Sequence, residues 1–104
     1  MNVSEPSILV LLHAPTDPSL ERARNNALNI LRERPEARIY IVVNAQGVRA
    51  ALKAPHPQTD KLLLVCANTL RKMELTAPET LKTVPSAVMA LITMQQDGWI
   101  YIRA

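Results

Sequence analysis

Short runs of consecutive apolar residues alternate along this chain with segments whose apolar residues recur every three or four positions. The first three runs are Ser7–His13, Arg38–Val43 and Lys61–Cys66. A continuous apolar run is typical of a strand that is covered on both faces, as in parallel sheets. Strands that alternate with helices are joined by right-handed crossovers, which place helices on both faces of the sheet. The sequence therefore predicts an α/β fold, a three-layer α/β/α sandwich with a five-stranded, mostly parallel sheet.

The helices are predicted from caps and breakers. Asp17 is the expected N-cap of the first helix, which ends near Pro35, and a short helix follows the turn Asn44–Gly47. A third helix is expected over Ala67–Met73, capped by Asn68 or Thr69. Further along, we expect one helical turn at Thr76–Glu79, a strand at Leu81–Val84, a helix from Pro85 to Asp97–Gly98 and a last strand at Trp99–Ile102.

The last helix and strand carry many apolar residues. Val88, Leu91, Ile92 and Gln95 share one side of the helix, and both faces of the strand are apolar. Such a strand lies inside the sheet or is covered by another subunit.

Composition restricts the class of protein. The chain has 104 residues, 48% of them apolar, which is enough for one domain over residues 1–104 that folds without a metal or cofactor. Its longest apolar runs fall short of the roughly 20 residues that span a bilayer. Glu5 and the interruption at His13 argue against a secretory signal, so we expect a cytoplasmic protein.

Charge and aromatic content argue against a nucleic-acid partner. The net charge is +3, and acidic residues are interleaved with the basic ones. Binding of nucleic acid favours a concentrated basic stripe, and single strands also need stacking rings. Only 3% of the residues are aromatic and there is no phenylalanine.

The loops after the first three strands are the expected site. In parallel α/β sheets, ligands bind in the crevice beyond the carboxyl ends of the strands. These loops carry His13, Asn44 with Gly47, and Cys66.

Cys66 stands where a strand passes into a helix. The unpaired N–H groups of a helix N-terminus favour a thiolate, and Arg71 would act in the same direction if it points back toward the sulfur. Free cysteines are also among the most buried residues, so an inert core thiol is the alternative. Because Cys66 is the only cysteine, no internal disulfide forms, and disulfide reductase chemistry is disfavoured.

The remaining polar residues also have two interpretations. His13 either supports an ionised cysteine or simply meets solvent at a strand end. Asn44 and Asn68 are expected to satisfy backbone groups at loop ends, and Gln46-Gly47 lacks the full glycine pattern of a nucleotide loop. Two isolated histidines and one cysteine offer no ligand spacing, so we predict no metal site.

The segment "LLLVCANTLRKMEL" resembles the DsrE-like family of small sulfur-relay proteins, the DsrE/DsrF-like proteins with a YchN-like fold. The resemblance extends to "ILVLLHA", "NAQGVRAALK" and "TVPSAVMALITMQQDGWIYI". It implies that Cys66 receives sulfane sulfur as a persulfide and passes it to a partner thiol. It also implies a homo-oligomer, a trimer or hexamer, with the cysteine near a subunit interface. Two positions depart from the family: Glu74 stands about where relatives have glycine, and Asn44 where several have histidine.

Three hypotheses remain open from the sequence. The first is a sulfur carrier or sulfurtransferase that uses Cys66, with His13, Asn44, Gly47, Asn68, Thr69 and Arg71 as binding or supporting residues. The second is a small-molecule or nucleotide binding module with an inert cysteine. The third is an oligomeric scaffold without chemistry.

Overall fold

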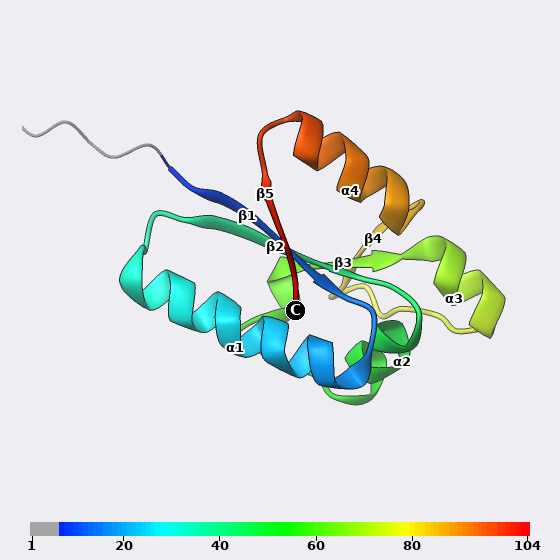
Figure 1. The fold of residues 1–104 in the computed structure, drawn as a ribbon. Coiled ribbons are helices and arrows are strands. Elements are labelled where there is room, and N and C mark those ends of the chain that lie inside the picture. The colour runs from blue at the N-terminus through cyan, green and yellow to red at the C-terminus, as the bar shows by residue number, and fades with distance from the viewer. Residues whose placement is uncertain (1–6) are drawn as a thin grey trace, which may run out of the picture.

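The computed structural model describes residues 7–104, which form a five-stranded sheet (Figure 1). The strand order is β4-β3-β2-β1-β5, and all neighbouring strands are parallel. The strands are β1 (Leu9–Ala14), β2 (Arg38–Val43), β3 (Leu63–Cys66), β4 (Lys82–Val84) and β5 (Ile100–Arg103). The predicted parallel sheet of five strands is confirmed.

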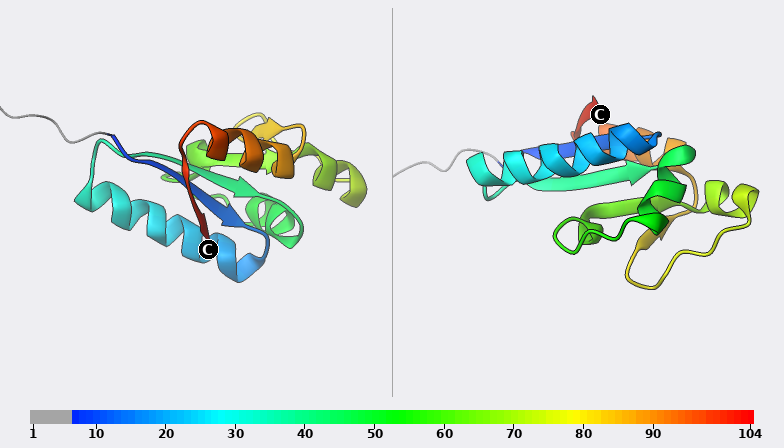
Figure 2. Two further views of the ribbon diagram at one scale, coloured as in Figure 1. Left: turned by 45° about the horizontal axis from the view of Figure 1, so that its top comes forward. Right: turned by 90° about the horizontal axis from the view of Figure 1, so that it is seen from below.

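Helices cover both faces of the sheet. They are α1 (Asp17–Glu33), α2 (Gln46–Lys53), α3 (Ala67–Met73) and α4 (Ala87–Gln96), with a 3-10 helix η1 (Asp60–Leu62) before β3. Figure 2 shows α1 and α2 on one face, α4 on the other, and α3 extending beyond the end of β3. The three-layer α/β/α sandwich is therefore present.

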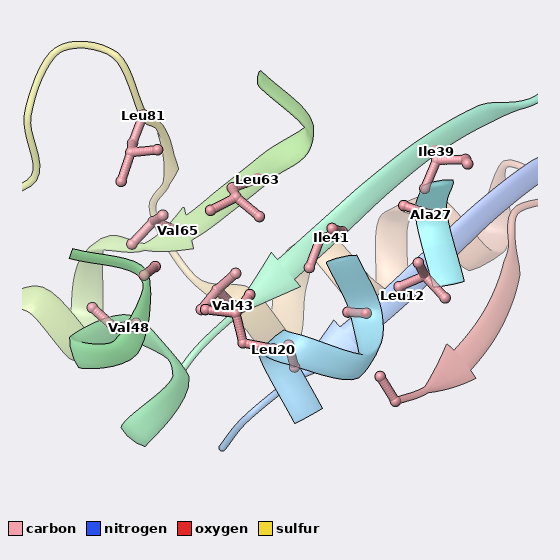
Figure 3. Close-up of a cluster of buried hydrophobic side chains, with 14 of the residues drawn as sticks. Leu12, Leu20, Ala27, Ile39, Ile41, Val43, Val48, Leu63, Val65 and Leu81 are labelled. Atoms are coloured by element: carbon pink, nitrogen blue, oxygen red, sulfur yellow. The ribbon is translucent and has the colours of Figure 1, made fainter. Parts of the chain in front are cut away.

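The main core lies between the sheet and the pair α1 and α2 (Figure 3). Alternate strand residues point to this side because successive side chains of a strand face opposite ways. Its fully buried members include Leu12, Ile41, Leu63 and Val65 from the strands and Leu20, Ala27 and Val48 from the helices.

A smaller core lies under α4. Leu11, Val42, Cys66 and Ala87 are buried there, and Tyr40, Leu64, Leu91, Met94 and Trp99 pack against them. Cys66 thus belongs to the α4 side of the sheet.

Three local predictions are wrong at the level of caps and turns. Thr16, not Asp17, caps α1, because its hydroxyl accepts the N–H of Ser19. Cys66 itself is the N-cap of α3, since β3 passes into the helix without a loop. No helical turn forms at Thr76–Glu79. Pro78 disfavours helical backbone at the preceding residue, and the segment ends in a turn closed by the Leu81 N–H on the Pro78 carbonyl.

Two helix ends adopt left-handed backbone. Gly98 follows α4 with φ +94°, as the Asp97-Gly98 pattern predicts. Glu74 ends α3 with φ 55°, a conformation that glycine adopts more easily. The departure from the family pattern at Glu74 therefore falls on a backbone position that favours glycine.

The last helix and strand are more exposed than the sequence predicts. The inner side of α4 is formed by Ala87, Leu91 and Met94, whereas Val88 and Ile92 face outward. β5 is an edge strand, and all four of its residues are exposed, so it is not an inner strand. No helix among residues 7–104 is sufficiently long and apolar to cross a membrane.

Candidate functional site

The carboxyl ends of three neighbouring strands bring the predicted polar residues to the α4 side of the sheet. His13 lies two residues after Leu11 in β1, and Cys66 lies two residues after Leu64 in β3. Asn44 directly follows β2 and lies two residues after Val42. Leu11, Val42 and Leu64 all belong to the core under α4, and residues two apart share a face. The three strands are neighbours in the order β3-β2-β1 (Figure 1). Cys66, Asn44 and His13 therefore lie in a row along the carboxyl ends of the strands.

Cys66 is enclosed at this edge, with 5% of its surface exposed. The backbone N–H of Ala87, at the start of α4, lies 3.4 Å from Sγ and donates to it. The Thr69 hydroxyl and the backbone N–H groups of Thr69 and Asn68 lie close enough to favour negative charge on the sulfur. The Cys66 side chain makes no cap hydrogen bond with α3, so the Ala87 N–H is its direct donor.

These donors set the ionisation of the thiol. Burial raises the pKa of Cys66, while hydrogen bonds from the Thr69 hydroxyl and from the amides of Thr69, Ala87 and Asn68 lower it by more. The net effect places the pKa of Cys66 below the ordinary value for a cysteine. Because the thiolate is the nucleophilic form, this arrangement favours reactivity wherever a reagent can reach the sulfur.

Thr69 is held in place by the neighbouring loop. The backbone N–H of Ala45 donates to its Oγ1 over 3.3 Å. A hydroxyl that accepts from an amide keeps its own proton available, and the Thr69 hydroxyl favours the charged form of Cys66. Ala45 has a positive φ of 50°, a backbone conformation that L-residues rarely adopt.

His13 is held from both sides. Its Nδ1 lies 2.7 Å from the hydroxyl of Tyr101, and its Nε2 lies 3.0 Å from Oδ1 of Asn44. The Asn44 oxygen only accepts, so the tautomer that satisfies both bonds carries its proton on Nε2 and accepts the Tyr101 O–H at Nδ1. His13 is therefore not a donor to Cys66, and the groups that stabilise the thiolate are amides and the Thr69 hydroxyl.

The other predicted site residues separate into two groups. Asn68 and Thr69 lie against Cys66, as described above. Arg71 does not point at the sulfur but hydrogen-bonds Oδ1 of Asn68 at the surface. Gly47 contacts the end of β1: a Cβ there would lie 2.3 Å from the Ala14 carbonyl oxygen, so its role is to allow close packing of α2.

Two residues of the site, Tyr101 and Ala87, could not be identified from the sequence. Tyr101 reaches His13 only because β5 pairs with β1, a register that no local pattern reveals. Ala87 donates its backbone N–H to Cys66, and because every residue except proline has this group, the side chain gives no indication of the contact. The one local indication is that Tyr101 alternates with Ile100 and Ile102. In a strand, this alternation places the Tyr101 ring on the opposite face of the sheet from the two isoleucines.

Two hollows adjoin the elements around Cys66, although Cys66 itself lines neither. One, of about 370 Å³, is lined by Asn68, Thr69, Arg71 and Lys72. The other, of about 410 Å³, runs between α4 and the β3-β4 edge and is mainly apolar. Among residues 7–104, no group of three or more His, Cys, Asp or Glu side chains is placed to hold a metal ion.

The comparisons with known proteins establish the fold. No family model matches the chain, and no curated protein matches its sequence. Its structure is similar to that of the protein of unknown function MTH1491 from Methanobacterium thermoautotrophicum, with a TM-score of 0.75 and 21% sequence identity. The match covers 96% of this chain and 100% of that one. At this identity the likeness extends to the architecture alone.

Proposed function

We propose that this protein carries sulfane sulfur as a persulfide on Cys66 and passes it to a thiol of a partner protein. The observation that carries the proposal is the position of Cys66, at the junction of β3 and α3 with the Ala87 N–H donating to Sγ. These surroundings lower the pKa of a thiol that burial alone would keep neutral.

The chemistry is two transfers of one sulfur atom. The Cys66 thiolate attacks the outer sulfur of a donor persulfide R–S–SH. A new S–S bond forms, the donor S–S bond breaks, and R–S⁻ leaves. A partner thiolate then attacks the outer sulfur of Cys66–S–SH, and the Cys66 thiolate is the leaving group. No net oxidation occurs, and a low thiol pKa helps the second step because it makes Cys66 a better leaving group.

The resemblance to the DsrE-like proteins supports the same role, since Cys66 stands where the family carries its persulfide. One cysteine is sufficient, because the second thiol belongs to the partner. A working thiol of this kind needs a reducing compartment, so we place the protein in the cytoplasm. Whether such a protein counts as a sulfurtransferase or a carrier depends on whether it accelerates the transfer from its donor.

Self-association is part of this proposal, as a trimer or hexamer. The support is a set of exposed apolar residues: Val88, Met89 and Ile92 on α4, Tyr101 on the same side of β5, and Ile100 and Ile102 on the opposite face of that edge strand. Large exposed apolar patches are characteristic of interaction surfaces. β5 also has no strand partner on its outer side among residues 7–104, and such edges are usually covered. Tyr101 belongs to this surface and to the His13 cluster, so an interface here would adjoin the site.

The deciding experiment is intact mass spectrometry after incubation with a polysulfide. We expect one added sulfur atom on the wild-type protein, its loss on treatment with a small thiol, and no addition to Cys66→Ser. An unmodified wild-type protein, or an adduct that persists in Cys66→Ser, would refute the proposal and leave a binding module or a scaffold.

A further inference from the structure

A groove between α1 and α2 lies on the face of the sheet opposite Cys66. Its volume is about 420 Å³, within the range of small-molecule sites. Leu20, Ala50 and Ala54 supply its apolar lining. The remaining lining residues are polar or charged: Asp17, Glu21, Arg24, Asn25, Lys53 and His56.

One end of the groove is fixed by a hydrogen-bonded network. Nη2 of Arg24 donates to Oδ1 of Asp60 over 2.9 Å, and Oδ2 of Asp60 accepts the His56 N–H over 3.0 Å. The His56 ring in turn bonds the fully buried Thr59 hydroxyl over 2.8 Å. Arg24 of α1 and the loop after α2 are therefore tied together, and the wall they form is preorganised.

Arg24 is left with one unsatisfied donor. The residue is 7% exposed, and its Nε is the one buried side-chain nitrogen or oxygen of residues 7–104 that has no hydrogen-bond partner. A buried donor without an acceptor is costly and rare in folded proteins. Arg24 also lines the groove, so a small rotation of its side chain would bring this N–H to an oxygen acceptor of a bound ligand.

The two helices present opposite charges to the groove. Asp17 and Glu21 lie four residues apart on α1 and so share one side of that helix. Lys53 comes from α2. None of these three side chains forms an ion pair within residues 7–104. Free carboxylates beside a free ammonium and a buried guanidinium suit a molecule with both charges.

We propose that this groove binds a small zwitterion with an apolar body, of the size and charge pattern of an α-amino acid. Its carboxylate meets Arg24 and Lys53, its ammonium meets Glu21 and Asp17, and its side chain covers Ala50 and Ala54. The site is independent of Cys66, since the two lie on opposite faces of the sheet.

The probe is L-leucine, with two fragments as controls: 3-methylbutylamine, which lacks the carboxylate, and 4-methylpentanoate, which lacks the amine. Binding is followed by thermal shift and by NMR titration of the full chain. We expect L-leucine to raise the melting temperature and to shift amide resonances of α1 and α2. Neither fragment should do so at the same concentration. Equal effects of the fragments, or no response to L-leucine or to any of the other common amino acids, would overturn the proposal.

Variants locate the site. Glu21→Gln and Lys53→Gln should each weaken L-leucine binding about threefold, the effect of one exposed ion pair. Glu33→Gln on α1 and Arg49→Gln on α2 are matched controls outside the groove and should bind as wild type. Cys66→Ser should also bind as wild type, which separates this result from the test of sulfur transfer. Unchanged binding in Glu21→Gln and Lys53→Gln would place any bound ligand elsewhere and refute the assignment.

Discussion

The backbone N–H of Ala87 donates to Sγ of Cys66 over 3.4 Å. These residues are 21 positions apart, and their contact joins the end of β3 to the start of α4. It stabilises negative charge on a sulfur that is almost fully buried. A reagent must therefore displace the residues packed around the thiolate, and ionisation and accessibility should respond separately to mutation.

Alkylation of Cys66 should have a midpoint at lower pH in the folded protein than in the same protein in denaturant. The cause is the lowered pKa of the thiol. The measurement is the rate of iodoacetamide addition against pH, followed by mass spectrometry. A folded midpoint at or above the denatured one would show that burial outweighs the donors.

The same pKa shift affects stability. A thiol whose folded pKa is depressed adds stability that is fully present above its unfolded pKa and is lost as the pH falls through the folded pKa. The free energy of unfolding of the wild type, relative to Cys66→Ser, should therefore rise with pH between the folded pKa and the ordinary thiol value. Urea denaturation across this window tests the sign, and a falling difference would contradict it.

Thr69→Val should slow Cys66 alkylation at neutral pH by about tenfold, because it removes the hydroxyl that helps to lower the pKa of the thiol. The fold should persist, since the volume is nearly equal and the Ala45 N–H that loses its acceptor is exposed. Thr83→Val controls for the substitution itself. If both variants react like the wild type, the Thr69 hydroxyl has no part in stabilising the thiolate.

Tyr101→Phe should release His13 from its fixed tautomer. The O–H that His13 accepts at Nδ1 is lost, while the ring remains against the imidazole. Nitrogen NMR of the imidazole distinguishes the tautomers. We expect one Nε2–H form in the wild type and a mixture in the variant, with a loss of stability below about 1 kcal/mol because the pair is partly exposed. An unchanged spectrum would show that the hydrogen bond to Asn44 alone fixes the tautomer of His13.

Gly47→Ala should destabilise the protein by about 2 kcal/mol or more, because the new Cβ would meet a backbone oxygen at 2.3 Å. Gly98→Ala is the comparison. Nothing lies within 4 Å of a Cβ there, but φ is +94°, so the cost should be nearer 1 kcal/mol and come from the backbone alone. Equal losses in urea denaturation would argue against a packing role for Gly47.

Val88→Asp should dissociate the proposed oligomer without unfolding the subunit. Val88 is 62% exposed on the outer side of α4, so a charge there costs little in the isolated chain. Sedimentation or light scattering gives the mass of the assembly. Lys72→Asp, on α3 and away from this surface, is the control. A wild-type protein that is already monomeric would exclude self-association through α4 and β5.

The strand and helix order could be predicted from the sequence because continuous apolar runs and helical spacing are local signals. Cys66, Asn44 and His13 could be placed at one edge for the same reason, since parallel strands bring their carboxyl ends together. The contacts of Tyr101 and Ala87 could not, because they depend on the pairing of β5 with β1 and on the docking of α4. Val88 and Ile92 were misplaced because α4 is apolar all round, so that its pattern does not identify an inner side.

β5 is the last element of the sheet along the chain, yet its Tyr101 completes the hydrogen bonds of His13 in β1, 88 residues earlier. During synthesis, β1 to β3 can pair while α4 and β5 are still within the ribosome. The His13 cluster and the packing of α4 against Cys66 then form only after α4 and β5 have emerged. A nascent chain would hold its one thiol uncovered until that moment, exposed to the oxidants and metals of its surroundings.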